Sequence, residues 1–96
     1  MAGPLPPPSS FAIQGPLARE DLPALYDRFC SFVSEHAPER VLCDVTGVEP
    51  SAVTVDALAR MQLAARRNGC TVTLCHASER LLALVALMGL ADVLPG

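Results

Sequence analysis

Two hydroxyl side chains, Ser51 and Thr54, stand where the sequence is best suited to chemistry. They belong to the stretch GVEPSAVTVDALAR (47–60), which follows an apolar run and precedes a charged helical pattern, as a strand-to-helix turn does. The first amide groups of a helix have no partner within it, so such a turn can hold an anion or orient a nucleophile. The same hydroxyls can instead cap the helix by accepting one of those free N–H groups. We expect capping, with phosphorylation of Ser51 or Thr54 as the alternative.

The charged residues around this turn have more ordinary interpretations. Asp44 ends an apolar run, and we expect its carboxylate to accept backbone amides of the following turn. Asp56 suits the first turn of a helix, although its charge would repel a phosphate added nearby. Three arginines of the second helix could form a docking rim for an acidic partner, but a solvated helix face is favoured. They are Arg60, Arg66 and Arg67.

No set of residues typical of an enzyme is present. The sequence has no Ser–His–acid combination, no glycine-rich phosphate loop and no paired catalytic acids. The four cysteines form no Cys-x-x-Cys pair, and the two histidines do not complete a metal spacing. We therefore expect a non-enzymatic protein with no metal, no cofactor and free, reduced, mostly buried thiols. The residues concerned are Cys30, Cys43, Cys70, Cys75, His36 and His76.

The length and net charge of the chain exclude further classes of protein and partner. The 96 residues suit one small domain, and 51% of them are hydrophobic, enough for a core. The formal net charge of −3 argues against nucleic acid as a partner, because phosphate binding needs a basic face. The start, MAGPLPPPSS, lacks the features of a secretory signal, and no apolar run is long enough to cross a bilayer. We expect a cytoplasmic protein with no direct membrane insertion.

The elements that must position these residues follow from hydrophobic spacing. Residues 1–9 are proline-rich and predict a disordered leader, which leaves 10–96 as the folded domain. Strands are expected over 10–15, 40–45 and 71–77, and helices over 22–36, 54–68 and 79–88. This alternation predicts a small α/β sandwich with helices packed on a mostly parallel sheet of about three to four strands. The run RVLCDV (40–45) is nearly all apolar, which suits a strand buried on both faces.

Capping residues support these helix boundaries. Asp21 and Ser78 are placed to cap the first and third helices, and Gly69 is placed just past the end of the second. The third helix is unusual because apolar side chains cover most of its circumference. Two interpretations are equally supported: the C-terminal tail covers its second side, or that side is an exposed patch for self-association or a partner.

The ordered set of segments resembles the STAS domain, found in sulfate transporters and anti-sigma-factor antagonists. RVLCDVTGV (40–48) is similar to a characteristic strand of that family. The segment from 55 to 95 is similar to its continuation: an Arg-rich helix ending in Gly, a strand, a short helix and a closing Leu-Pro. Asp44, Gly47, Gly69 and the pair Gly89–Leu90 fall in register together, and the resemblance covers 10–95.

The resemblance implies a bacterial, non-enzymatic α/β domain that acts through protein–protein interaction. Members bind anti-sigma-factor kinases, sit on transporters or serve as accessory subunits of lipid-transport ABC ATPases. In the antagonist branch, a Ser after an Asp at the start of the second helix is phosphorylated, which abolishes kinase binding. This chain departs from that D-S-S-G signature, because Ala52 or Val53 falls at the acceptor position and Ser51 and Thr54 flank it.

Two functional hypotheses follow. The first is an anti-sigma-factor antagonist-like module for signalling and transcription regulation, which binds a kinase-like anti-sigma factor. The second is a constitutive structural subunit of a larger assembly, such as a lipid-transport ABC ATPase complex, or a homodimer. The expected partner-binding residues are Glu49, Ser51, Val53, Asp56, Arg60, Leu84 and Met88.

Overall fold

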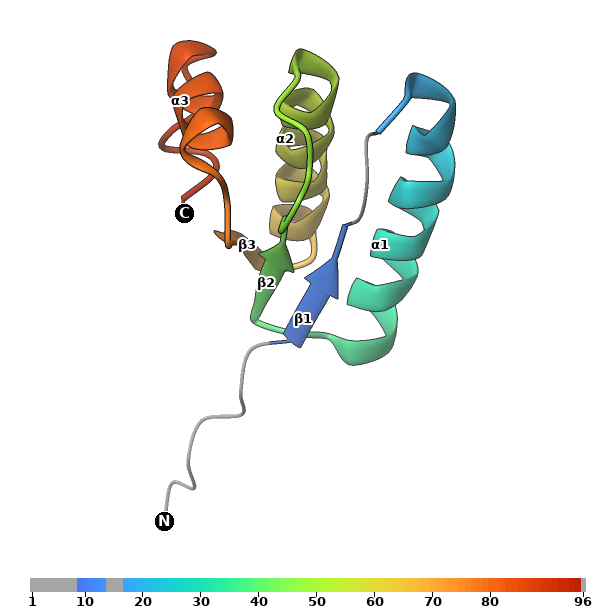
Figure 1. Ribbon diagram of the computed structural model, residues 1–96. Coiled ribbons are helices and arrows are strands. Elements are labelled where there is room, and N and C mark those ends of the chain that lie inside the picture. Colours follow the sequence, from blue (N-terminus) through green and yellow to red (C-terminus); the bar gives the residue numbers. More distant parts are fainter. Residues whose placement is uncertain (1–8, 14–16, 96) are drawn as a thin grey trace.

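A three-stranded parallel sheet and three α-helices make up the computed structural model, which describes residues 9–13 and 17–95 (Figure 1). The strands are β1 (Ser9–Ala12), β2 (Arg40–Asp44) and β3 (Thr71–Cys75), and they lie in chain order. The helices are α1 (Leu22–His36), α2 (Ala52–Arg67) and α3 (Glu79–Leu87), with a short 3-10 helix, η1 (Arg19–Asp21), before α1. The predicted α/β class and parallel sheet are confirmed.

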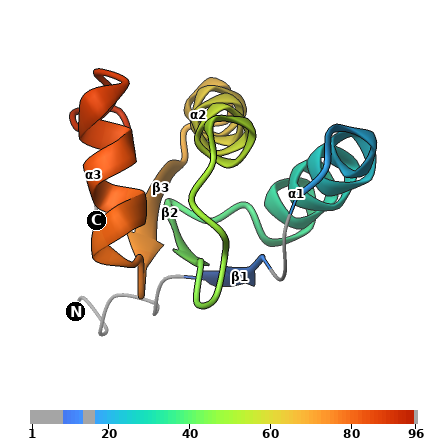
Figure 2. The same ribbon diagram turned by 45° about the horizontal axis from the view of Figure 1, so that its top comes forward.

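All three helices lie on the same face of the sheet, with α2 between α1 and α3 (Figure 2). The strand order explains this arrangement. Parallel strands are joined by right-handed crossovers. Each strand of this sheet is added on the same side of the previous one, so the connecting helices α1 and α2 fall on one face. Within the described residues, helices therefore cover one face of the sheet and none lies on the other.

The expectation that the strand at 40–45 is buried on both faces is wrong. Val41 and Cys43 have no exposed surface, whereas Leu42 and Asp44, which alternate with them, are only half-buried. Val72 and Leu74 of β3 show the same alternation with the residues beside them. The apolar side chain of Leu42 made the run look continuous, but helices cover only one side of the sheet.

The core fills the layer between the covered face and the helices. The central helix, α2, buries five apolar side chains completely: Val55, Ala57, Leu58, Met61 and Ala65. Helix α1 contributes Leu25, Phe29 and Val33, and Phe11 of β1 meets Phe29 edge to face at 5.4 Å between ring centroids. This packing fixes the start of α2 against the sheet, which positions the turn before it.

The helix boundaries match the expectations to within two residues, and one expected cap is not formed. The first helix spans 22–36 as predicted, but the Asp21 carboxylate does not cap it; this side chain accepts the Ala18 N–H at 3.1 Å instead. The second helix begins at Ala52, two residues earlier than predicted, because Ser51 is its N-cap. Gly69 follows its end with a positive φ of 72°, as a C′ glycine does, and Ser78 caps α3.

The C-terminal tail covers the outer edge of β3 and leaves much of α3 uncovered. Leu94 is buried, and the Leu74 N–H donates to the Pro95 carbonyl at 2.9 Å. Helix α3 buries Leu81 and Val85, whereas its other side keeps Leu82, Leu87 and Met88 exposed. The tail therefore covers the edge of β3 and not the second side of α3, and that side is exposed, as the second interpretation predicted.

Of the proposed leader 1–9, residues 1–8 lie outside the described residues, and Ser9 is already part of β1.

Candidate functional site

The turn between β2 and α2 lies at the carboxyl end of the parallel strands and is held in place at both ends. The Val45 N–H donates to the Cys75 carbonyl at 3.0 Å, which continues the ladder one residue past β2. The Val48 N–H donates to the Val45 carbonyl at 3.1 Å, and the Val48 side chain is buried. Gly47 sits between them with a φ of 73°, a conformation that favours glycine. The turn is therefore a fixed platform for the start of α2.

Ser51 and Thr54 form one hydrogen-bonded cap. The Ser51 hydroxyl oxygen accepts the Thr54 N–H at 3.1 Å and donates to the Thr54 hydroxyl oxygen at 3.0 Å. The Thr54 hydroxyl then donates to the Glu49 carbonyl at 3.1 Å, which ties the helix back to the turn. Ser51 therefore caps the helix as expected, whereas the Thr54 hydroxyl accepts no backbone N–H and instead links the cap to the turn.

Ser51 and Thr54 differ in their exposure to solvent. Thr54 is only 1% exposed and lies inside the first turn of α2, whereas Ser51 is half-buried at the N-cap. A kinase must reach the hydroxyl that it modifies. Of the two candidate phosphoacceptors, Ser51 therefore has the more accessible position, although modification would break its bonds to Thr54.

Asp44 organises the first residues after β2. Its carboxylate accepts the Thr46 hydroxyl at 2.6 Å and the Thr46 N–H at 3.0 Å, as expected for an Asp that starts a turn. These two hydrogen bonds, with a smaller contribution from His76, hold the pKa of Asp44 below its ordinary value. Through its two hydrogen bonds with Thr46, Asp44 orders the turn.

A hollow of about 550 Å³ brings together four of the seven expected partner-binding residues. We call it the helix-end groove, because the start of α1, the start of α2 and the end of α3 meet there at one end of the molecule (Figure 1). Its lining residues are Arg19, Leu22, Tyr26, Ala52, Val53, Asp56, Arg60 and Met88. Asp56 and Arg60 form an exposed ion pair with the Arg60 Nε 2.8 Å from a carboxylate oxygen.

The other three expected residues do not line this groove. Glu49 is exposed in the turn and Ser51 forms the cap, so both lie beside the groove rather than in it. Leu84 is half-buried and packs against the core. The sequence named Leu84 together with Met88 on the apolar third helix, but the packing of α3 turns Leu84 toward the core.

Tyr26 also lines the helix-end groove, but the sequence did not identify it as a partner-binding residue. Its helical spacing assigned it to the apolar stripe of the first helix, and only its hydroxyl distinguished it from its apolar neighbours. In the structure it lies near Arg60 and Asp56. Burial raises the pKa of Tyr26, the positive charge of Arg60 opposes that shift, and Asp56 adds to it.

The described part of the chain, 9–13 and 17–95, contains no group of three His, Cys, Asp or Glu side chains placed to hold a metal ion. Within the same ranges, no helix combines the length and the apolar character needed to cross a membrane.

Comparison with known proteins adds one match. The protein-family model described as "Mlab, STAS domain" matches residues 8–95, which is nearly the whole chain. No curated protein matches the sequence.

Proposed function

The chain belongs to the STAS domain family, and from that premise we propose that it is a non-enzymatic regulatory module that acts by binding a protein partner. The observation that carries the proposal is the helix-end groove beside the capped turn. Three helices contribute to it, and it combines an ion pair with apolar side chains, as protein-docking surfaces do.

Exposed apolar side chains extend this surface onto α3. Leu87 is 83% exposed and follows the buried Val85 on the same helix, and Met88 beside it lines the groove at 39% exposure. A protein does not gain stability from a leucine that remains in water, but a partner that covers it gains apolar burial. The proposed docking surface therefore joins the turn 47–51, the start of α2 and the end of α3.

We propose that the partner is an anti-sigma factor of the kinase-like class, so that the chain is an anti-sigma-factor antagonist in the cytoplasm of a bacterium. The fixed turn at the start of α2 supports this, because it occupies the place where antagonist STAS domains carry their regulatory serine. Ser51 is the residue of this chain that could accept phosphate there. A dianionic phosphate at Ser51 would break the cap and repel an acidic docking partner.

A second candidate is a constitutive accessory subunit of a larger assembly, such as a lipid-transport ABC ATPase complex. The specific observation in its favour is the state of the hydroxyls. Thr54 is enclosed, Ser51 is committed to capping, and Ala52 or Val53 occupies the family's acceptor position. A subunit that stays bound needs no phosphorylation switch.

Affinity capture from the native host tests the proposal and separates its two forms. Wild type should enrich one protein, and Met88→Lys should lose it while unfolding at the same temperature as wild type. Glu35→Lys, an exposed change on α1 away from the groove, serves as the matched control and should retain the partner. Recovery of an anti-sigma kinase supports the first form, and recovery of an ATPase supports the second. Equal capture by wild type and Met88→Lys would reject this docking surface.

The phosphorylation state is measured separately. Intact-mass analysis of the chain from the native host should show a phosphate adduct that Ser51→Ala abolishes, if the switch operates. A chain without phosphate under conditions that activate and silence the pathway would favour the constitutive subunit.

A further inference from the structure

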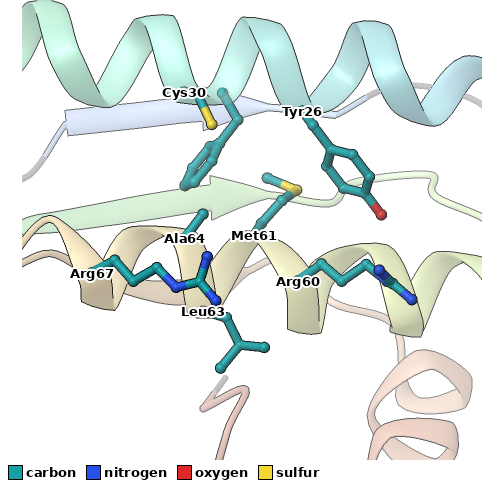
Figure 3. A pocket seen from close by; sticks show the side chains of 8 residues that line it. Tyr26, Cys30, Arg60, Met61, Leu63, Ala64 and Arg67 are labelled. Carbon is teal, nitrogen blue, oxygen red and sulfur yellow. The ribbon is translucent and has the colours of Figure 1, made fainter.

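A second groove runs between α1 and α2 and continues from the helix-end groove. We call it the interhelical groove; it encloses about 270 Å³ and shares Tyr26 and Arg60 with its neighbour. Figure 3 shows Tyr26 and Cys30 of α1 facing Arg60, Met61 and Arg67 of α2 across it. The remaining lining residues are Phe29, Leu63 and Ala64.

The charge along this groove is of one sign. Arg60 and Arg67 are separated by seven residues of α2, which is about 10.5 Å along a helix, and both line the groove. None of the lining residues is acidic, although the chain as a whole has a net charge of −3. Within the described residues, the single ion pair is Arg60 with Asp56, at the end of the groove nearest the turn. The lining of the groove is thus basic on an acidic protein: Arg60 shares its charge with Asp56, and Arg67 has no ion-pair partner among the described residues.

The floor and one wall of the groove are apolar. Phe29 and Met61 are fully buried beneath it, and Ala64 is partly covered. Leu63 stands on the α2 side with 53% of its surface exposed, which makes it a large apolar side chain in water in the middle of a helix. An apolar strip edged by arginines matches one face of an amphipathic helix that carries acidic side chains.

The Tyr26 hydroxyl is a third, independent feature. Among the described residues, the Tyr26 hydroxyl oxygen is the one buried side-chain oxygen or nitrogen atom that has no hydrogen-bond partner. It lies where the two grooves meet, on the same side as the Arg60 guanidinium (Figure 3). The Arg60 side chain is 65% exposed although it pairs with Asp56, so an acidic group of another molecule can reach its guanidinium. Buried hydroxyl groups are ordinarily paired, so this donor fits a site that is completed by another molecule.

We propose that the interhelical groove binds an amphipathic helix of the protein partner, with two acidic side chains seven residues apart that pair with Arg60 and Arg67. An acceptor group near the first of these acids takes the Tyr26 hydrogen bond. The proposal rests on the proposed function, since it names the chemistry of one segment of the partner, but it concerns a different groove.

A displayed library of helical peptides tests this directly. The peptides have about 18 residues, or five turns, with one fixed apolar stripe and flanking positions randomised among Glu, Lys, Gln and Ser. Selection is performed on the full wild-type chain, on Arg60→Glu/Arg67→Glu and on Arg66→Glu. Arg66 is exposed on α2 but does not line the groove, so it is the matched control.

Wild type and Arg66→Glu should both enrich Glu at two positions seven apart, and the double variant should enrich Lys there. The best peptide should bind Arg67→Glu at least about tenfold more weakly than wild type, and Arg66→Glu within about twofold, because only the first change places like charges together. Leu63→Ala should also weaken binding of this peptide, and Tyr26→Phe should weaken its binding without unfolding the chain.

Three results would overturn the inference. One is the absence of any enriched charge pattern; another is the same pattern on the double variant as on wild type. The third is self-association of the wild-type chain that Arg67→Glu abolishes, which would assign the groove to a second copy. In the capture assay, retention of the partner by Arg67→Glu but not by Met88→Lys would reject this inference while leaving the proposed function intact. Failure of wild type to capture any partner would reject the proposed function instead.

Discussion

The Gln62 side chain pairs with both backbone groups of Val72. Its amide nitrogen donates to the Val72 carbonyl at 2.9 Å, and its oxygen accepts the Val72 N–H at 2.8 Å. The same nitrogen donates to the Val93 carbonyl of the C-terminal tail at 2.8 Å. A side chain of α2 therefore takes the place of a neighbouring strand along the edge of β3, where peptide groups would otherwise be buried without partners.

Replacement of Gln62 should be among the most damaging single changes in this chain. Gln62→Leu leaves the N–H and carbonyl of Val72 and the Val93 carbonyl unpaired, and each buried unpaired group costs about 1–3 kcal/mol. We expect a loss of about 3 kcal/mol or more in the free energy of unfolding. Urea unfolding followed by circular dichroism measures it, with exposed Arg66→Ala as a control that changes stability by less than about 0.5 kcal/mol. A neutral Gln62→Leu would mean that these bonds are not formed.

The cap at the start of α2 gives a second prediction. Ser51→Ala removes the acceptor for the Thr54 N–H and should cost about 1 kcal/mol of unfolding free energy. Ser51→Asp keeps an acceptor at the N-cap and should retain most of that stability. Ser78→Ala removes the equivalent bond to the Leu81 N–H at α3 and should cost a similar amount. If Ser51→Ala were as stable as wild type while Ser78→Ala were not, the cap of α2 would contribute nothing.

Asp44 predicts a defined pH dependence. Its pKa is lowered in the folded chain, chiefly by the two hydrogen bonds from Thr46. Its stabilising contribution is therefore fully present above the unfolded carboxyl pKa of about 3.9 and is lost as pH falls through the lower folded value. Thr46→Val should destabilise the chain by a constant amount above about pH 5, and the difference should shrink below it. NMR titration should show the Asp44 pKa rising in Thr46→Val and unchanged in Thr73→Val.

The two sides of α3 should respond differently to truncation. Leu81 has no exposed surface, so Leu81→Ala should cost about 2–5 kcal/mol through lost burial and the cavity left behind. Leu87 is 83% exposed on the same helix, and Leu87→Ala should change stability by less than about 0.5 kcal/mol. Thermal unfolding of both variants provides the comparison. A large loss from Leu87→Ala would show that a second chain covers this side of α3 in solution.

Cysteine reactivity tests the one-sided sheet. Burial, together with the neighbouring Asp44 and Cys75, raises the pKa of Cys43 to about 12, and the thiolate is the reactive form. Cys75 lies on the face without helices and is only half-buried, and Cys30 is exposed on α1. A thiol reagent at pH 8 should therefore modify Cys30 first, Cys75 next, and Cys43 and Cys70 only after unfolding. Mass spectrometry of digested samples gives the order, and protection of Cys75 equal to that of Cys43 would contradict an open face.

Local signals predicted much of the fold. The first helix was predicted over 22–36 and is observed there, because its apolar spacing and the proline after it are properties of adjacent residues. Ser51, Ser78 and Gly69 end or begin helices as their types indicate. The ends of the short strands were predicted less well: the first strand begins at Ser9 rather than at residue 10 and is observed to Ala12. Residues 14 and 15 of the predicted strand lie outside the described residues.

Local sequence signals did not predict how the residues of the candidate site are arranged in space. The sequence named Val53, Asp56, Arg60 and Met88 as partner-binding residues, but it could not show that they line one groove or that Tyr26 completes it. Met88 reaches the start of α2 only because α3 packs beside it on the same face of the sheet. Neither Thr54 nor Gln62 has a pattern in the sequence that reveals its burial.

Sequence alone was sufficient for the order of the elements, the caps of α2 and α3 and the STAS family, because spacing, capping and motif order depend on residues close together along the chain. Tertiary packing was needed to show three further features: one face of the sheet carries no helix of the described residues, Thr54 is enclosed, and two connected grooves lie along α2. These features follow from the order of the strands and the packing of three helices on one side. Such contacts join residues distant in the chain, and no local pattern records them.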